Sequence, residues 1–323
     1  MLKSKSRVKI GTISLILISI FLLGTCLTIG SATTYQATLN KGTEFFQVIA
    51  YNETAWQNTV NASSTPSDWF GGDAHIMGAQ GKFTTLGWTS ATWTMYDVLT
   101  SIFLTDSIDL FALNSIKGIG YNETEINNNY TNQYQLIQGM RSEWYFTIEP
   151  FNESSNSATD MPVILSNPAD YEKILDDYNA LANTIQDDPI IPLDIKMVFK
   201  NISTDEFLWQ LIMGNLAVGA PSNIYIQALV NALPCDNASF SENTLIFERT
   251  GETNYTVEVT YGTRGTISSF VIKDDTGTII YQYISIGDTN LMVYIIAGVI
   301  ISCFSILIVV LIYKKRRFNK LNR

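Results

Sequence analysis

Two long hydrophobic stretches without charge lie near the ends of the chain, and polar sequence fills the region between them. Residues 291–313 read LMVYIIAGVIISCFSILIVVLIY and are followed by four cations, Lys314, Lys315, Arg316 and Arg317. At about 1.5 Å per residue such a helix is about 34 Å long, enough to cross a hydrocarbon core of about 30 Å. The sequence therefore predicts a transmembrane helix over residues 291–313 and a basic cytoplasmic tail over residues 314–323.

The N-terminal hydrophobic stretch has the features of an export signal. Residues 10–30 are uncharged and follow a short basic segment that carries Lys3, Lys5, Arg7 and Lys9. Small residues before Ala32 suit cleavage after that residue, but the stretch is also long enough to be retained. We predict that residues 1–32 are a signal peptide or a signal anchor. In both cases residues 33–290 lie outside the cell and the C-terminus is cytoplasmic, in a single-pass protein or, if the segment is retained, a two-pass one.

Short apolar runs predict strands in the first half of the exterior region. The runs fall at residues 45–51, 82–99 and 143–148. Aromatic and β-branched residues dominate them, and these residue types favour strands. Residues 52–81 and 127–129 are polar and predict loops, whereas residues 100–116 fit a helix or a further strand. We expect residues 33–150 to be mainly β.

Helix signals are clearer in the second half. Apolar residues recur every three or four positions over residues 168–186, which predicts an amphipathic helix. Ser203 and Glu206 form a capping box for a helix over residues 204–216, and a third helix is expected over residues 222–233. Strands are expected at five runs, of which the last four form an antiparallel meander: residues 193–199, 245–249, 255–261, 266–273 and 278–286.

These elements predict an α+β fold. We expect an antiparallel β-sheet ectodomain with two or three packed helices, flanked by the N-terminal signal or anchor segment and the C-terminal transmembrane helix. Residues 149–160 are polar and resemble a linker. The ectodomain is therefore either one domain or two parts, a mainly β part over residues 33–150 and an α+β part over residues 161–290.

The charge distribution supports this topology. The chain has 20 Lys and Arg and 30 Asp and Glu. All 30 acidic residues but only ten of the basic ones lie between the two hydrophobic stretches, so the exterior region carries a net charge of −20. Cations flank both stretches, as on the cytoplasmic side of a membrane. A strongly acidic exterior also argues against nucleic acid as a partner.

Glycosylation sequons are frequent in the same region. The pattern Asn-x-Ser/Thr occurs at Asn52, Asn61, Asn122, Asn129, Asn152, Asn201, Asn237 and Asn254. Such sites are used on surface loops of exported proteins. We predict a glycosylated ectodomain.

Residues that carry catalysis or bind metals are scarce. His75 is the single histidine, and it lies in a Gly-Gly-Asp-Ala-His run without an accompanying catalytic motif, which favours a surface loop. Cys235 is the single cysteine between the hydrophobic stretches, so no disulfide forms within the exterior region. No catalytic residue, metal ligand or cofactor is predicted. Carboxylate pairs such as Asp176 and Asp177 leave a carboxylate-based hydrolase as an alternative.

Aromatic residues are concentrated between residues 56 and 96. Aromatic faces bind sugars and apolar ligands, and they also fill protein cores. The candidate ligand-stacking residues are Trp56, Trp69, Trp88 and Trp93.

The layout of the two ends resembles a known group of proteins. Gly42-Thr43-Glu44-Phe45 follows the export segment, a hairpin carries the turn Asp274-Asp275-Thr276-Gly277, and a terminal span precedes a KKRR tail. This arrangement is similar to that of the uncharacterised single-span surface proteins of Asgard-type archaea. The resemblance implies an archaeal envelope location and no activity.

From these features we predict a membrane-anchored, glycosylated cell-surface protein that acts as a binding, adhesion or envelope-structural module. Its partners are the lipid bilayer and envelope glycans or other surface proteins. The alternatives are an extracellular carboxylate-based hydrolase and a carrier of a lipid or other apolar ligand. An apolar pocket would favour the carrier, and a pocket with converging carboxylates would favour the hydrolase.

Overall fold

The computed structural model describes residues 35–36, 42–104, 107–151, 157–214 and 216–286. The predicted signal segment, the predicted transmembrane helix with its cytoplasmic cations, and Asn152 lie outside these residues. Within the described ranges, every helix is too short or too polar to cross a bilayer.

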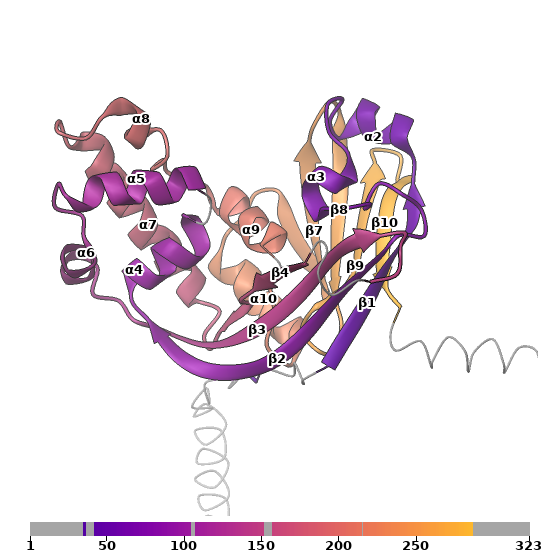
Figure 1. Ribbon diagram of the computed structural model, residues 1–323, viewed down its shortest axis with the longest axis horizontal. Coiled ribbons are helices and arrows are strands. Elements are labelled where there is room, and N and C mark those ends of the chain that lie inside the picture. The colour runs from indigo at the N-terminus through magenta and orange to yellow at the C-terminus, as the bar shows by residue number, and fades with distance from the viewer. Residues whose placement is uncertain (1–34, 37–41, 105–106, 152–156, 215, 287–323) are drawn as a thin grey trace, which may run out of the picture. The chain divides into compact units, whose positions relative to one another are not determined.

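A ten-stranded antiparallel sheet organises the described residues (Figure 1). Its strand order is β4-β3-β2-β1-β10-β9-β8-β7-β6, and β5 pairs with β3. The strands are β1 (Gly42–Tyr51), β2 (Gln80–Trp93), β3 (Tyr134–Thr147), β4 (Ser157–Asp160), β5 (Val163–Leu165), β6 (Ala238–Ser241), β7 (Thr244–Thr250), β8 (Asn254–Tyr261), β9 (Ile267–Asp274) and β10 (Ile279–Ser285). Because β1 pairs with both β2 and β10, strands from the two halves of the region between the hydrophobic stretches share one sheet.

The C-terminal meander is confirmed. Strands β7 to β10 pair in sequence order, as expected for hairpin-connected strands. In β8, Tyr255, Val257, Val259 and Tyr261 are buried, whereas the residues between them are partly exposed. This period of two places one face of the meander against the core.

Helices cover the sheet and extend beyond it. They are α2 (Glu53–Thr59), α3 (Pro66–Phe70), α4 (Met95–Val98), the π-helix η1 (Leu99–Phe103), α5 (Ser107–Lys117), α6 (Glu123–Asn129), α7 (Asp170–Asp187), α8 (Leu193–Lys196), α9 (Thr204–Met213) and α10 (Ser222–Ala232). Helices α7, α9 and α10 confirm the three predicted ones. Ser203 caps α9 as expected, since its Oγ accepts from the Glu206 backbone N–H at 3.2 Å.

The expected number of two or three helices is wrong, because the described part of the chain contains nine α-helices. The predicted loops at residues 52–81 and 127–129 contain α2, α3 and part of α6, and residues 100–103 and 107–116 are helical. Two of these helices have capping boxes, Thr65 with Asp68 at α3 and Asn122 with Glu125 at α6. These short capping motifs lie in Asn-, Ser- and Gly-rich sequence. Composition alone therefore predicts loops there.

The strand predicted at residues 193–199 is also wrong, because α8 begins there. Leu193 is 75% exposed and Ile195 is buried. The Gln186 side-chain amide donates to the carbonyl oxygens of Lys196 at 2.5 Å and Phe199 at 2.6 Å. This segment therefore bonds to the end of α7 instead of a sheet, and a short apolar run alone does not distinguish the two structures.

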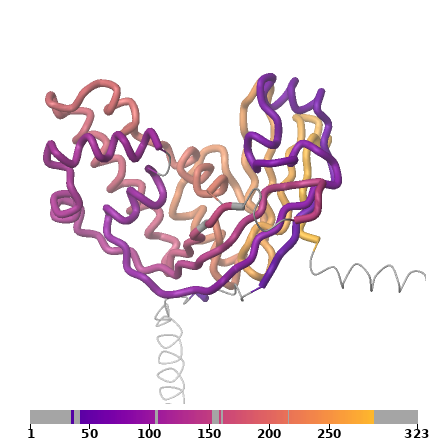
Figure 2. Tube along the Cα trace, in the orientation of Figure 1, coloured from indigo at the N-terminus to yellow at the C-terminus, as the bar shows by residue number. Residues whose placement is uncertain are grey.

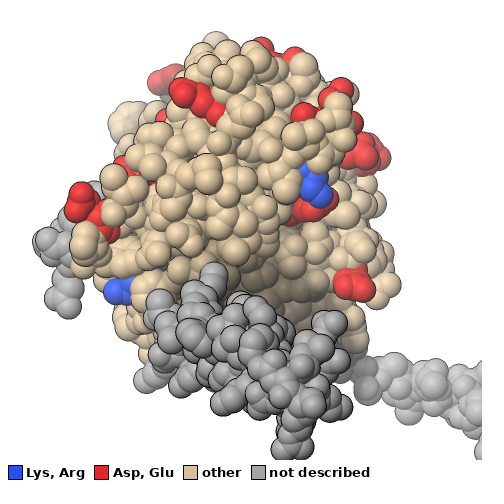
Figure 3. All heavy atoms as spheres, turned by 90° about the vertical axis from the view of Figure 1, so that its right-hand side faces the viewer, with Lys and Arg blue, Asp and Glu red and all other residues tan. Residues whose placement is uncertain are grey.

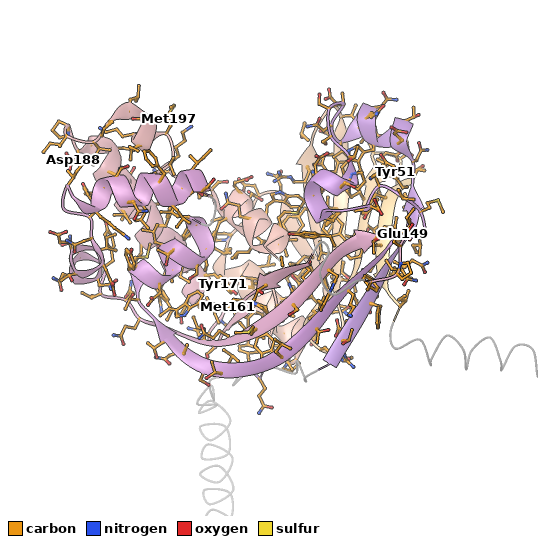
Figure 4. All side chains as sticks on the ribbon, viewed as in Figure 1. Tyr51, Glu149, Met161, Tyr171, Asp188 and Met197 are labelled. Atoms are coloured by element: carbon orange, nitrogen blue, oxygen red, sulfur yellow. The ribbon has the colours of Figure 1, made fainter. Side chains whose placement is uncertain are left out.

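The helices form two groups along the sheet (Figures 1 and 2). Helices α4 to α8 gather at one end of the long strands β2 and β3, and α2 and α3 lie over the part formed by β8 to β10. Helix α7 runs from the buried Tyr171 near the sheet towards Asp188, which lies with Met197 at the far end of the helical group (Figure 4). Helix α9 lies between the two groups, where its Trp209 contacts Trp69 of α3 at a ring distance of 5.6 Å.

Candidate functional site

A pocket of about 340 Å³ lies between the sheet and helices α3 and α9. This volume falls within the range of about 300 to 1,000 Å³ that is usual for small-molecule sites. Most of its lining is aromatic or aliphatic. The lining residues are Phe46, Ser67, Asp68, Trp69, Phe70, Gly71, Gly81, Lys82, Phe83, Arg141, Glu143, Trp144, Tyr145, Phe146, Ile212, Met213, Leu216, Thr266, Ile267, Phe270 and Tyr283.

Mutual ring contacts hold the aromatic walls in place. Phe70 of α3 contacts Phe270 of β9 at 4.9 Å and Tyr283 of β10 at 5.3 Å between ring centroids. Phe46 and Phe83, on neighbouring strands, lie 5.1 Å apart. Rings at these distances stabilise each other and lose little conformational freedom when a ligand binds. The pocket is therefore preformed.

Two oppositely charged residues of β3, Arg141 and Glu143, line the pocket among these aromatic residues. Arg141 and Glu143 are two residues apart on the strand, so their side chains point to the same face of the sheet. Arg141 is only 4% exposed, and its guanidinium carbon lies 4.5 Å from the centroid of the Phe83 ring. A guanidinium stays protonated in proteins, so the pocket contains a permanent buried charge with a carboxylate nearby.

Both charges affect the pKa of the Tyr283 hydroxyl. Burial raises the pKa of its hydroxyl, the Glu143 carboxylate raises this pKa further, and the Arg141 guanidinium opposes the shift. The hydroxyl therefore stays protonated at neutral pH. It is a hydrogen-bond donor and acceptor in the pocket, and it is not an activated nucleophile.

Two other charged lining residues have structural roles. Lys82 lies between Gly81 and Phe83 in β2, so strand alternation turns its side chain to the opposite face, where its Nζ is 4.1 Å from the centroid of the Trp144 ring. The Asp68 carboxylate accepts from the Thr65 backbone N–H at 2.7 Å as part of the α3 cap. Arg141 and Glu143 are the other two charged residues of the lining.

Ser67 and His75 form a hydrogen-bonded pair at the edge of the pocket. The Ser67 Oγ lies 2.7 Å from the His75 Nδ1 and also accepts from the His75 backbone N–H at 3.2 Å. A serine beside a base is half of a nucleophilic site, which also needs a group to orient the base. Among the residues that the structure describes, no carboxylate binds the other ring nitrogen of His75. His75 is exposed in a loop, as the sequence predicted.

The four candidate tryptophans lie in different surroundings. Trp69 lines the pocket. Trp56 is fully buried behind it, at a ring distance of 5.1 Å. Trp93 is buried and donates from Nε1 to the Gln138 side chain at 3.2 Å, and Trp88 is half-buried. The structure therefore brings only Trp69 of the four into the pocket.

Arg141 and Glu143 were missed by sequence reasoning. The available signal was an Arg-x-Glu pair in an otherwise uncharged strand, which places two opposite charges on one face. Nothing local indicates that this face is buried, since that depends on α3 and α9.

The sequons lie at the surface wherever the structure describes them. Asn122 is half-buried, and the others are exposed: Asn52, Asn61, Asn129, Asn201, Asn237 and Asn254. Asn52 and Asn122 cap helices through Oδ1, which leaves Nδ2, the atom that carries a glycan, free of that role. Glycosylation of these sites stays a prediction.

Acidic side chains are scattered over the face shown in Figure 3, and basic ones are few there. The acidic side chains do not form a metal-binding cluster, since no group of three or more potential metal-ligating side chains occurs among the described residues. Comparison with protein-family models, curated proteins and solved structures finds no match for the chain.

Proposed function

We propose that this protein is a cell-surface binding module that holds a small ligand in the pocket between the sheet and helices α3 and α9. The observation that carries the proposal is the buried Arg141 within preformed aromatic walls. Small-molecule sites combine apolar and aromatic walls with a few well-placed polar groups, and this pocket has that composition. Membrane anchoring by residues 291–313 and glycosylation of the exterior region belong to the same proposal and rest on the sequence.

Binding is better supported than carboxylate-based hydrolysis. Glycoside hydrolysis needs two carboxyl groups on either side of the scissile bond. The carboxyl groups of this pocket are those of Glu143 and Asp68, and Asp68 is engaged in the α3 cap. The Ser67–His75 pair lacks an orienting carboxylate among the described residues, so serine-based hydrolysis is also less well supported.

An arginine substitution tests the proposal. Full-length protein is screened by ligand-observed NMR against a library of small amphipathic compounds, and Kd values are then measured by calorimetry. Arg141→Ala should weaken binding by about ten- to a hundredfold, because a charged hydrogen bond contributes about 1.5–3 kcal/mol. Arg264→Ala is the matched control, since Arg264 pairs with Glu44 at 3.2 Å and does not line the pocket.

Thermal unfolding of both variants separates lost binding from lost folding, and Arg141→Lys provides a milder change if Arg141→Ala unfolds. Equal affinity in the wild type and a folded Arg141 variant would contradict the proposal. Covalent labelling of Ser67 by a fluorophosphonate would instead favour the hydrolase.

A further inference from the structure

A row of side chains crosses β1, β2 and β3 on the face that is turned away from the pocket, here called the outer face. Phe45 pairs directly with Lys82, and Lys82 pairs directly with Trp144, so these three side chains point to the same face. The Lys82 Nζ lies 4.1 Å from the centroid of the Trp144 ring and 5.5 Å from that of the Phe151 ring. The Phe151 ring is in turn 6.0 Å from the Phe45 ring. Three aromatic rings therefore surround one ammonium group on the outer face.

Exposed apolar side chains extend the outer face beyond these rings. Met140 precedes Trp144 by four positions on β3, so it points to the same face, and it is 52% exposed. Leu86 lies in the bulge of β2 beside the position that pairs with Met140, and it is 47% exposed. Exposed apolar side chains that are grouped in this way mark a surface that contacts a protein or a membrane.

The charges of these strands favour a membrane. Glu44 and Glu143 are the acidic residues of β1 to β3, and both pair with Phe83, which lines the pocket. Their carboxylates therefore point to the pocket side of the sheet. The charge on the outer face of these strands is that of Lys82, although the region between the hydrophobic stretches has a net charge of −20. A face with a lysine, a tryptophan and no carboxylate suits the head-group layer of a bilayer.

The last described residue lies beside this face. Ile286 follows β10, and its backbone N–H donates to the Phe45 carbonyl oxygen at 2.9 Å. Four residues, 287–290, separate Ile286 from the start of the predicted transmembrane helix at Leu291. A fully extended chain covers this separation in at most about 18 Å. A membrane span over residues 291–313 would therefore keep β1 close to the bilayer.

We infer that the outer face of β1 to β3 rests on the bilayer in which the chain is anchored, and this inference rests on the anchoring that belongs to the proposed function. Phe45, Trp144 and Phe151 contact the head-group layer, where aromatic rings are favoured, and the Lys82 ammonium reaches the lipid phosphates. Helices α3 and α9 lie on the other side of these strands (Figure 1). The docked sheet therefore turns the pocket away from the membrane, towards ligands outside the cell.

Quenching of tryptophan fluorescence by brominated lipid tests this contact. Full-length protein is reconstituted into vesicles of phosphatidylcholine and phosphatidylglycerol, with and without acyl chains brominated close to the head group. The wild type should be quenched, and Trp144→Phe should lose most of this quenching because it removes the tryptophan at the lipid surface. Trp69→Phe is the matched control, since Trp69 lines the pocket on the other face and its replacement should leave the quenching unchanged.

A charge reversal on the outer face provides a second test. Lys82→Glu should lower the quenching towards that of Trp144→Phe, because lipid phosphates attract the ammonium and repel a carboxylate. Lys200→Glu makes the same change at an exposed residue after α8 and should have no effect. Circular dichroism shows whether the variants are folded, and Lys82→Gln replaces Lys82→Glu if that variant unfolds.

Flotation of the vesicles distinguishes this inference from the anchoring on which it rests. Protein that floats with the vesicles, with equal quenching of the wild type and Trp144→Phe, would overturn the docking of the outer face and leave the anchoring intact. Protein that does not float would contradict the anchoring and the docking together. Ligand binding in the pocket is measured separately with the Arg141 variants, so its result decides the binding part of the proposed function alone.

Discussion

Some buried tyrosine hydroxyls in the core have a hydrogen-bond partner and others do not. Replacement of tyrosine by phenylalanine should therefore lower stability at the first kind of position and raise it at the second. Tyr261 and Tyr281 are fully buried, and their hydroxyls have no hydrogen-bond partner among the described residues. The Tyr225 hydroxyl, also fully buried, donates to the Leu165 carbonyl oxygen at 3.0 Å. A buried polar group without a partner costs about 1–3 kcal/mol, whereas a satisfied hydrogen bond stabilises by about 1 kcal/mol.

Replacement of these tyrosines by phenylalanine tests which of the hydroxyls have a hydrogen-bond partner. Tyr261→Phe and Tyr281→Phe should raise the free energy of unfolding by about 1 kcal/mol, and Tyr225→Phe should lower it by a similar amount. Urea denaturation followed by circular dichroism measures the three values. Loss of stability in the first two variants would mean that their hydroxyls have partners in solution.

At the scale of elements, the junction of α3 with β3 depends on a glycine. Gly71 ends α3 with φ +73° and ψ 165°, a conformation that residues with a side chain rarely adopt. The ring of Tyr145 packs against it at 2.7 Å from the position of an added Cβ. Gly71→Ala should therefore lower stability by about 1–3 kcal/mol and disturb the pocket rim.

Gly118→Ala is the control for this change. Gly118 follows α5, has open space around its Cβ position and lacks a positive φ, so its effect should stay within about 0.5 kcal/mol. Differential scanning calorimetry compares the two variants. Equal melting temperatures would show that the junction adapts to a side chain.

For the whole molecule, the number of buried tyrosines predicts unfolding in alkali. Burial raises the pKa of Tyr171 and of Tyr178 to about 12, with Asp109 adding to the shift of Tyr178. Because these native pKa values lie above the unfolded value of about 10, the stability that they contribute is complete below pH ~10 and is lost as the pH rises towards 12. Each group contributes up to about 3 kcal/mol over this range, a large fraction of a typical unfolding free energy of about 5–15 kcal/mol.

We therefore expect cooperative unfolding between about pH 10 and 12. Phenolate absorbance and circular dichroism should change together, since these tyrosines ionise only in the unfolded chain. Gradual phenolate formation at constant circular dichroism would show that they are accessible in the native state.

Local periodicity in the sequence determined α7, α9, α10 and strands β7 to β10. Their apolar positions recur at the helical or strand period, and hairpin turns bring consecutive strands together without help from distant residues. The net charge of the region between the hydrophobic stretches and the positions of the sequons could also be read from the sequence, because they depend on composition and short motifs.

Only the tertiary structure decided the helical state of residues 193–196, the pairing of β1 with β10, and the pocket. The Gln186 side chain bonds the segment that follows α7 to this helix. Strand β1 pairs with a strand more than 200 residues away. Neither outcome can therefore be predicted from a short stretch of sequence. Arg141 and Glu143 became a candidate site because α3 and α9 cover that face of the sheet. A strand's own sequence places two side chains on one face, but burial of that face depends on segments far along the chain, and burial gives these two charges their chemical significance.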